Sequence, residues 1–445
     1  MSTEASTREP PSQPRTEGNS AEASFLTDDF LRQVMNVGEV DILVGLPTHN
    51  NAKTVGPIVE AVRAGILKWF PRERAVIINA DGGSRDGTPD IVTGASIDDV
   101  RRGSKLYALR TLHAISTKYG RTPEAGTALR TILSAAELMR AKACVVVSPE
   151  STTVQPDWIQ RLLRPVYNEH FDLVTPVYRR HMFEGLLMSN LLYPMMRAIY
   201  GVKVREPYAS EFAFSGRLAG ELVGRSIWSE ESVRTSAEMS FTLAAITGGF
   251  RIHQVFLGDK SHTEHRASDL VAAIRRTVGT LFWTMGKNPA DWMSAAGLQP
   301  LSTEGPEYEL RVDPVRVNRK RLWQLFSAAV TDLEAVLRSV LSAATLSELQ
   351  RIAKLEEDDF RYPADLWAQT VYEFADSYHK SVIDRDHILQ ALAPLFRGRI
   401  FTFLIENCNG TSAEEVENSV EALCFEFEKL KPYLVEMWRR EVRIS

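Results

Sequence analysis

Residues 41–88 read DILVGLPTHNNAKTVGPIVEAVRAGILKWFPRERAVIINADGGSRDGT, and this stretch decides the fold class. A short apolar run at residues 41–46 predicts a buried strand that Pro47 ends. Residues 54–69 carry apolar side chains at helical spacing, and residues 74–80 form a second buried run. A strand, a helix and a second strand in this order are typical of a parallel βαβ unit.

The same alternation continues toward the C-terminus. Apolar runs predict further strands, and amphipathic patterns between them predict helices. The strands are expected at 109–116, 143–148 and 172–177, and the helices at 127–140 and 156–167, with one more helix at 25–37. We therefore expect an α/β domain with a mainly parallel sheet, whose ligands collect at the carboxyl ends of the strands.

Three regions differ in composition. Residues 1–24 contain no large apolar residue after Met1 and carry three prolines, which predicts a disordered tail. Residues 25–300 hold the α/β pattern. Residues 301–445 hold long amphipathic patterns without a strand signal, which predicts an all-helical C-terminal domain that packs on the α/β domain or forms a homodimer.

The overall composition excludes several classes of protein. The chain has 445 residues, 44% of them hydrophobic and 24% charged, and its net charge is -5, so no basic field favours nucleic acid. No apolar run approaches the roughly 20 residues of a spanning helix, and the polar N-terminus lacks the core of a signal peptide. Its three cysteines, Cys144, Cys408 and Cys424, lack metal-site spacing. We expect a cytoplasmic protein.

Polar segments follow three of the predicted strands. The Gly-rich segment 81–88 begins with Asp81, a carboxylate that suits a base or ribose contact beneath a closely approaching backbone. The segment is also typical of an ordinary turn whose residues 86–88 cap the next helix. Residues 45–51 and 148–150 follow two other strands, so the three segments are expected to meet at one edge of the sheet.

With these segments the chain resembles GT-A fold glycosyltransferases of the family-2 type, and more closely the mannosylglycerate synthase and glucosyl-3-phosphoglycerate synthase group. The resemblance runs from about Leu26 to Arg440 and rests on DILVGLPTHNNAKT, DGGSRDGT, VQPDWI, YRRHMFEG, FLGDKSH and FEKLKPYLVEMW in this order. It implies a GT-A fold, which is a Rossmann-like sheet for nucleotide-diphosphate sugars. It further implies a UDP- or GDP-hexose donor, a small acceptor and divalent Mn or Mg.

The sequence departs from this group at its acidic motifs. The Asp-x-Asp motif is here Ser148-Pro149-Glu150, and the GKGxA loop is residues 124–128, without its lysine. The other two acidic positions of the group are Glu211 and Glu238. All three surviving carboxylates are thus glutamates, which predicts a divergent active site.

The resemblance also implies the roles of individual residues. It places Pro47, Asn50, Asp81 and Glu150 at the donor, Glu150 and His262 at the metal, and Glu211 and Glu238 at the reacting face. Carboxylate oxygen suits a hard divalent ion, and Mn²⁺ also accepts imidazole. A hydrogen-bonded structural histidine is the alternative for His262.

On the acceptor side the resemblance assigns Arg180 and Glu184. A guanidinium can hold a carboxylate with two hydrogen bonds, which suits a small acid. Leu186 and Met188 stand where the group has hydroxyl side chains, so the sequence predicts an acceptor with one acid group and an apolar portion. The alternatives are that Arg179 and Arg180 form a solvated basic patch and that the two apolar residues point into the core.

Three functional hypotheses follow. The first is a metal-assisted glycosyltransferase that moves a hexosyl group to a small acidic acceptor. The second is a catalytically degenerate protein of the same fold that binds nucleotide-sugar or a partner without transfer. The third, a nucleotidyltransferase, is disfavoured because residues 47–50 are not the Gly-rich basic loop that it needs.

Overall fold

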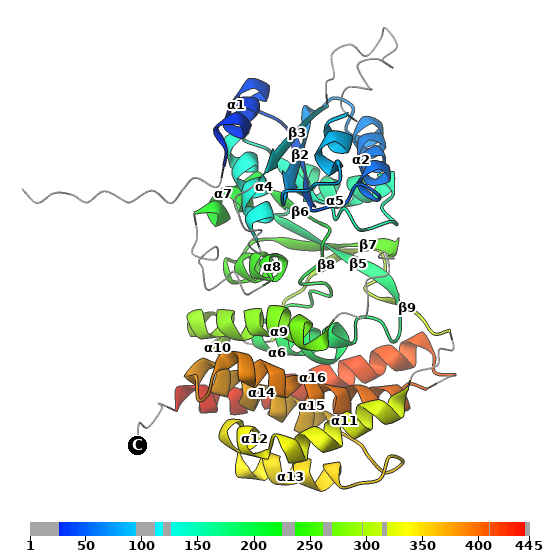
Figure 1. Ribbon diagram of the computed structural model, residues 1–445, viewed down its shortest axis with the longest axis vertical. Helices are drawn as coiled ribbons and strands as arrows, with labels where there is room; N and C mark the ends of the chain where they lie inside the picture. Colours follow the sequence, from blue (N-terminus) through cyan, green and yellow to red (C-terminus); the bar gives the residue numbers. More distant parts are fainter. Residues whose placement is uncertain are drawn as a thin grey trace, which may run out of the picture.

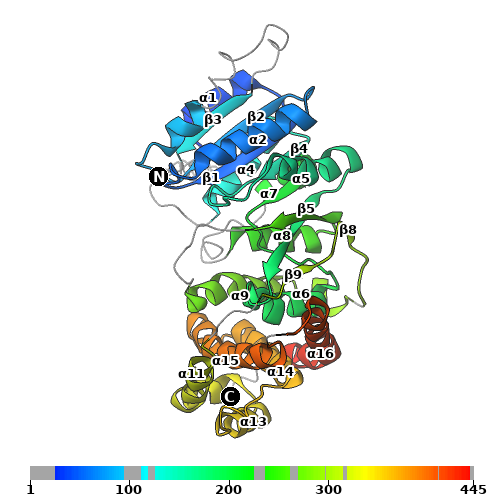
Figure 2. The same cartoon turned by 90° about the vertical axis from the view of Figure 1, so that its right-hand side faces the viewer.

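The computed structural model describes residues 26–94, 112–118, 126–224, 236–260, 269–295, 297–313, 318–408 and 410–440. These residues form an elongated molecule with a sheet-bearing part at one end and a helical part at the other (Figures 1 and 2). The predicted tail at residues 1–24 lies outside the described residues.

One mixed sheet organises the first part. Its strands are β1 (Ile42–Thr48), β2 (Ala75–Asp81), β3 (His113–Lys118), β4 (Ala143–Val146), β5 (Leu173–His181), β6 (Phe212–Ser215), β7 (Ile252–Asp259), β8 (Ser302–Glu304) and β9 (Glu309–Arg311). The order is β3-β2-β1-β4-β6-β5-β7-β8, and β9 pairs with the end of β5. Only the pairings of β6 with β4 and β5 are antiparallel. The carboxyl ends of β1, β2 and β4 therefore share one edge.

Helices cover both faces of this sheet, so its strands are buried as near-continuous apolar runs. One face carries α1 (Asp28–Val37), α4 (Thr127–Leu138), α7 (Gly216–Val223) and α8 (Ala237–Thr247), whose apolar side chains share a core with Leu43 and Val76. The other face carries α2 (Val55–Trp69) and α5 (Pro156–Glu169), which pack on Val44 and Ile77.

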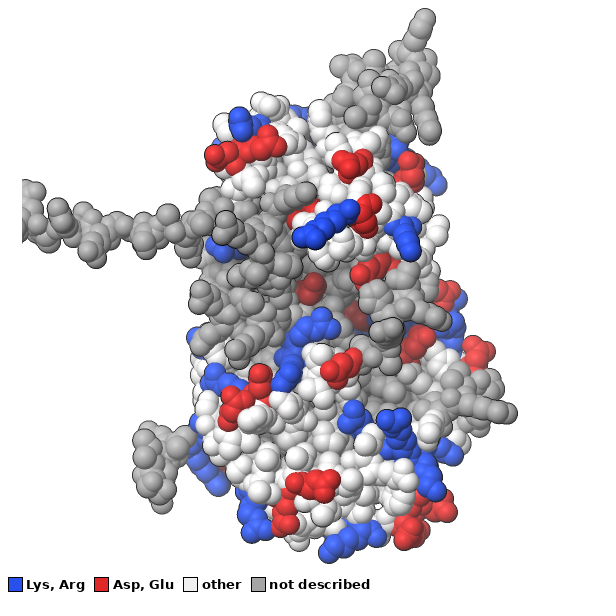
Figure 3. Space-filling model, in the orientation of Figure 1, with Lys and Arg blue, Asp and Glu red and all other residues white. Residues whose placement is uncertain are grey.

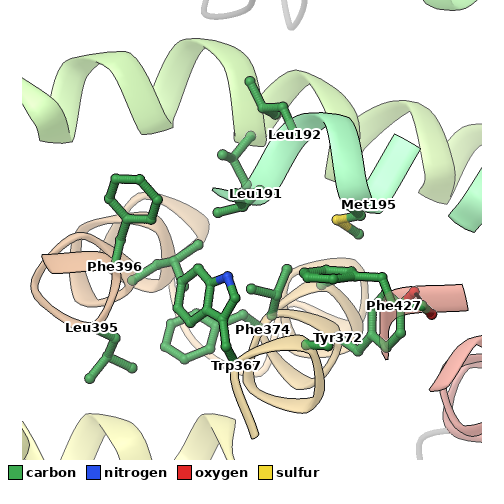
Figure 4. Close-up of a cluster of buried hydrophobic side chains, with 14 of the residues drawn as sticks. Leu191, Leu192, Met195, Trp367, Tyr372, Phe374, Leu395, Phe396 and Phe427 are labelled. Atoms are coloured by element: carbon green, nitrogen blue, oxygen red, sulfur yellow. Dashed lines mark hydrogen bonds between the residues drawn. The ribbon is translucent and has the colours of Figure 1, made fainter. Parts of the chain in front are cut away.

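The helical part consists of α11 (Arg319–Asp332), α12 (Glu334–Val340), α13 (Ala343–Ala353), α14 (Ala364–Lys380), α15 (Arg385–Glu406) and α16 (Ala413–Arg439). The middle of the molecule supplies η1 (Met188–Leu192), α6 (Tyr193–Tyr200), α9 (Leu270–Lys287) and α10 (Pro289–Met293) to the same core. Trp367 lies in that core beside Leu191 and Phe396, and its indole nitrogen donates to the carbonyl of Asn190 at 2.8 Å (Figure 4). The two parts are thus joined by one continuous apolar interior.

The predicted fold class is confirmed: a Rossmann-like, mainly parallel sheet is followed by a helical C-terminal region. Two details differ from the sequence prediction. The strands β8 and β9 follow residue 300, where no strand was expected, because three-residue strands held by backbone pairing leave no periodic signal. The first of the long amphipathic patterns expected within residues 301–445 is divided into three helices, α11, α12 and α13, with breaks at Leu333 and at 341–342.

Ion pairs of two largely buried arginines fasten α16 to α6 and to the loop that follows α6. The guanidinium of Arg197 pairs with Glu421 at 2.5 Å and Glu428 at 2.6 Å, and Arg205 pairs with Glu417. The Arg205 and Glu417 side chains are only 17% and 8% exposed, so each of these two charges relies on the other in place of water. Helix α16 is therefore held against the sheet-bearing part by charge as well as by apolar packing.

Among the described residues, one helix is long and apolar enough to cross a membrane. It is α15, and 78% of its apolar window is buried inside the molecule, as expected for the central helix of a bundle. On the face drawn in Figure 3, acidic and basic side chains are interspersed over both parts.

Candidate functional site

Asp81 ends β2 in a fully buried position. Its carboxylate accepts hydrogen bonds from the backbone nitrogens of Gly83 at 2.9 Å and Ser84 at 2.8 Å, and from the Thr48 hydroxyl at 3.0 Å. The Ser84 hydroxyl donates to it as well. The positive φ of Gly83, +86°, lets the chain turn back over the carboxylate. In this arrangement Asp81 organises the loop, and both of its carboxylate oxygens are buried and hydrogen-bonded within the protein.

The remaining polar residues of segment 81–88 hold the loop that follows β1. The backbone nitrogen of Asn51 donates to the Thr88 hydroxyl at 2.8 Å, and that of Ala52 donates to Asp86 at 2.9 Å. The side-chain oxygen of Asn50 accepts from the backbone nitrogen of Arg85 at 3.0 Å. Hydrogen bonds from Thr88 and Ala52 lower the pKa of Asp86. Asn50, predicted at the donor, thus serves to join two loops.

A cavity of about 290 Å³ opens at the carboxyl ends of β1 and β4, and we call it the β1–β4 cavity. It is lined by Pro47, Thr48, His49, Asn51, Gly126, Ala128, Leu129, Ile132, Val146, Ser148, Pro149, Glu150, Ser210, Phe212, Ala237 and Glu238. Of the predicted donor and catalytic residues, Pro47, Glu150 and Glu238 line it, whereas Asn50, Asp81 and Glu211 do not.

The first turn of α4 forms one wall of the β1–β4 cavity. Gly126, at the N-cap with φ of +96°, offers no side chain to the backbone N–H groups that follow it. Such a helix start presents unpaired donors and the positive end of the helix dipole. The wall suits an anion.

Two carboxylate side chains, those of Glu150 and Glu238, line this cavity. Glu238 accepts a hydrogen bond from the Ser236 hydroxyl at 2.9 Å, and the backbone nitrogen of Glu150 donates to the Ser148 hydroxyl at 3.2 Å. The part of the chain that the structure describes contains no group of three or more His, Cys, Asp or Glu side chains arranged for a metal. His262 lies outside the described residues, so its predicted role stays a prediction.

Glu211 lies beside the cavity in a sealed position. Its carboxylate accepts from the Tyr178 hydroxyl at 2.5 Å and from the Lys260 ammonium at 2.7 Å, with the Glu211 and Lys260 side chains 0% and 3% exposed. Lys260 also donates to the hydroxyl of Ser210 at 3.1 Å, and Ser210 lines the cavity. Burial, then the nearby Glu211 charge, raises the pKa of Tyr178. In this arrangement the buried lysine encloses Glu211, which does not line the cavity, and its assignment to the reacting face stays a prediction.

Lys260 had no assigned role in the sequence prediction, although it precedes the expected ligand His262. The one feature of the sequence that could have drawn attention to Lys260 is its position directly after the apolar strand β7. Its partner could not be inferred, because Glu211 is 49 residues away along the chain.

A second cavity, of about 90 Å³, lies between the end of β5, η1 and α16, and we call it the β5–α16 cavity. Both predicted acceptor residues, Arg180 and Glu184, line it. Met188 also lines it, while Leu186 packs against the apolar core. Phe403 of α15 and Val416 of α16 contribute to the wall, so the helical part completes this cavity.

The arginines of the predicted acceptor loop are already paired. Arg180 donates two hydrogen bonds to Glu206, at 2.7 and 2.9 Å. Burial lowers the pKa of Arg180, but the charge and hydrogen bonds of Glu206 outweigh that effect and raise it. Arg179 contacts Glu309 at 2.7 Å and Asp259 at 3.3 Å. Both guanidinium groups are thus paired with carboxylates of the protein, and the binding of an acceptor acid by Arg180 stays a prediction.

No protein-family model matches the chain, and a search of curated proteins gives no match. Among solved structures, glucosyl-3-phosphoglycerate synthase from Mycobacterium tuberculosis with Mn²⁺, UDP and glucosyl-3-phosphoglycerate is 20% identical over 56% of this chain and 80% of that chain, with a TM-score of 0.42. The same synthase with Mn²⁺, UDP-glucose and glycerol 3-phosphate is 21% identical over 59% and 85%, with a TM-score of 0.42. A likeness of this degree does not by itself assign a family or a function.

Proposed function

We propose that this protein is a glycosyltransferase that moves a hexosyl group from a UDP- or GDP-hexose to a small acceptor. The observation that carries the proposal is the β1–β4 cavity, which joins the carboxyl ends of two parallel strands, two carboxylates and the N-terminus of α4, where Gly126 provides no side-chain cap. Open α/β sheets bind nucleotides at this edge, and helix starts bind phosphate. The sequence resemblance supports the same activity.

The donor would lie in the β1–β4 cavity with its diphosphate toward Gly126 and Ala128. No side-chain cap accepts a hydrogen bond from the first backbone N–H groups of α4 there. Glu150 and Glu238 line the same cavity, and such a set of hard oxygen atoms fits Mg²⁺ or Mn²⁺. Glu150 would hold the ion together with His262. When bound, the ion would act as a Lewis acid that neutralises charge on the leaving diphosphate.

The transfer forms one bond and breaks one. The acceptor hydroxyl oxygen bonds to the anomeric carbon, and the bond from that carbon to the diphosphate oxygen breaks. The nucleoside diphosphate leaves with the electron pair, and the hydroxyl proton passes to solvent or to a carboxylate. Glu238 faces the cavity and could take that proton, whereas Glu211 would position Ser210 and Tyr178.

The enclosure of Glu211 by Lys260 favours the second candidate function, a protein that binds a nucleotide-sugar without transfer. The two candidates differ in one measurement. Release of nucleoside diphosphate, with a candidate acceptor present, supports transfer. Saturable binding with no release for any sugar supports the binding protein. A cytoplasmic location and a homodimer through the helical part stay predictions.

A panel of UDP- and GDP-hexoses, with and without Mn²⁺ or Mg²⁺, tests the donor assignment by thermal shift. A ligand at 100 times its Kd stabilises the folded state by about 2.7 kcal/mol, which is readily detected. One nucleotide-sugar should raise the melting temperature only when metal is present. Equal stabilisation in EDTA would contradict the metal assignment, and no stabilisation by any sugar would contradict the donor site.

Glu150→Ala should remove the metal-dependent part of this stabilisation, because it deletes the carboxylate that lines the cavity next to Ser148. The melting temperature of the ligand-free protein should change little, since the Glu150 side chain is not part of the buried core. Glu348→Ala, on the exposed side of α13, is the matched control. Undiminished metal dependence in Glu150→Ala would remove Glu150 from the site.

A further inference from the structure

Ser210 links the β1–β4 cavity to the buried ion pair behind it. It is partly exposed and lines the cavity, whereas Glu211 and Lys260 are almost fully buried and do not line it. The Lys260 ammonium donates to the Ser210 hydroxyl oxygen at 3.1 Å and to the Glu211 carboxylate at 2.7 Å. Of these three residues, Ser210 is therefore the one that a ligand in the cavity can touch.

The partners of the Ser210 hydroxyl give it a fixed role. An ammonium group has three N–H donors and no acceptor, so the serine oxygen accepts the bond from Lys260. The serine proton is directed at the two Glu211 oxygens, at 3.3 and 3.4 Å. These distances exceed the usual range of about 2.5–3.0 Å between two hydroxyl or carboxylate oxygens. Ser210 is thus a hydrogen-bond donor that holds its present acceptor weakly.

Glu211 loses little when that donor turns toward a ligand. Its carboxylate keeps the Tyr178 hydroxyl at 2.5 Å and the Lys260 ammonium at 2.7 Å, and hydrogen bonds of this length to a charged group are strong. Breaking the buried ion pair would cost far more than breaking the long bond from Ser210. A ligand oxygen at the cavity surface can therefore take the serine proton and leave the pair intact.

Ser210 lies at the end of the cavity that β6 and α8 form. It is two residues before Phe212, the first residue of β6, whose ring centre is 5.2 Å from that of Phe241 in α8. Glu238, in the first turn of α8, lines the same cavity. In the sheet, β6 is the neighbour of β4 on the side away from β1. A donor with its diphosphate at the start of α4 and its reacting carbon near Glu238 presents its sugar to this end.

We propose that Ser210 selects the sugar of the donor by donating a hydrogen bond to one of the sugar's hydroxyl oxygens. Lys260 is then a positioning residue, because it occupies a lone pair of the serine oxygen. The inference rests on the proposed function and adds a substrate class, a hexose that has a hydroxyl at the contacted carbon. The corresponding deoxy sugar binds only modestly worse, since the serine proton then returns to Glu211.

The first test separates the sugar from the nucleotide. Isothermal titration calorimetry of the full chain with Mn²⁺ compares UDP-glucose with UDP, and GDP-mannose with GDP. Ser210→Ala should weaken binding of the nucleotide-sugar about three- to tenfold, as expected for one neutral hydrogen bond, and leave binding of the nucleoside diphosphate unchanged. Ser339→Ala, at an exposed position on α12, is the control and should alter neither. Equal effects of Ser210→Ala on both ligands, or no effect on either, overturn the inference.

Deoxy analogues identify the contacted hydroxyl. The monodeoxy analogues of UDP-glucose or GDP-mannose, whichever the unmodified protein binds, are titrated into that protein and into Ser210→Ala. One analogue should bind the unmodified protein about three- to tenfold more weakly than the parent sugar, yet bind Ser210→Ala as well as the parent does, because both changes remove the same bond. If each analogue loses as much affinity for Ser210→Ala as for the unmodified protein, Ser210 contacts no sugar hydroxyl and the inference is wrong.

Lys260→Met tests the positioning role. It should weaken the nucleotide-sugar about as much as Ser210→Ala, spare the nucleoside diphosphate, and add no further loss when combined with Ser210→Ala. A loss that extends to UDP or GDP, or that adds to Ser210→Ala, contradicts this role. A melting curve first establishes that Lys260→Met is folded, and the analogues decide the question if it is not. Failure of the unmodified protein to bind any nucleotide-sugar overturns the proposed function, whereas binding without an effect of Ser210→Ala overturns only this inference.

Discussion

Asp81→Asn should lower the free energy of unfolding by about 1–3 kcal/mol, because an amide nitrogen would replace one of the two oxygens that together accept four hydrogen bonds from Gly83, Ser84 and Thr48. Asp81 is fully buried, so water cannot satisfy Gly83 and Ser84 instead. Nucleotide binding should fall in parallel, since the loop after β1 depends on the same network. Urea unfolding followed by circular dichroism measures the first effect.

Asp90→Asn, at an exposed position on the same stretch of chain, is the control and should change stability by less than about 0.5 kcal/mol. The opposite pattern is informative. If Asp81→Asn keeps full stability but loses nucleotide binding, the carboxylate contacts the ligand directly, as the sequence resemblance implies.

Lys260→Met should cost about 3–5 kcal/mol, because it leaves the fully buried Glu211 carboxylate without its cation. Adding Glu211→Gln should restore much of that loss, since an amide can still accept from Tyr178 and no charge remains buried. A double-mutant cycle in urea measures the coupling. Exposed Arg338 and Glu334 form the control pair, with an expected coupling of about 0–1 kcal/mol.

The same cycle tests the role of Glu211. If Glu211→Gln abolishes transfer while the coupling with Lys260 is near zero, Glu211 acts at the reacting centre and the resemblance is right about it. A large coupling together with residual transfer assigns Glu211 to positioning. Tyr178 and Ser210 would then be oriented by a buried ion pair behind the β1–β4 cavity.

The sheet and most helices could be predicted from the sequence because their signals are local. The apolar run before Asp81 is β2, and the helical spacing over 54–69 is α2 (Val55–Trp69). The glycines of segment 81–88 also predicted a turn from local sequence alone, and Gly83 and Gly87 have positive φ values of 86° and 87°. The short strands β8 and β9 escaped prediction because backbone pairing, not side-chain periodicity, holds them.

The candidate site could be predicted only in part. Glu150 and Glu238 follow β4 and begin α8, and both line the β1–β4 cavity as the order of the motifs suggested. Asn50 and Asp81 occur in the same motifs, yet their side chains hold the two loops together. A motif thus locates the edge of the sheet, but it does not say which polar atoms face the ligand.

By itself, the sequence determined the α/β alternation, the helical C-terminal region and the edge of the sheet where polar loops meet, because periodicity and turn chemistry act between near neighbours. Tertiary structure alone decided the partners of the charged groups. Arg180 meets Glu206 across 26 residues, Glu211 meets Lys260 across 49, and Arg205 meets Glu417 across 212. Each pairing sets whether a charge is free for a ligand, and each exists only because packing brings distant segments together out of water.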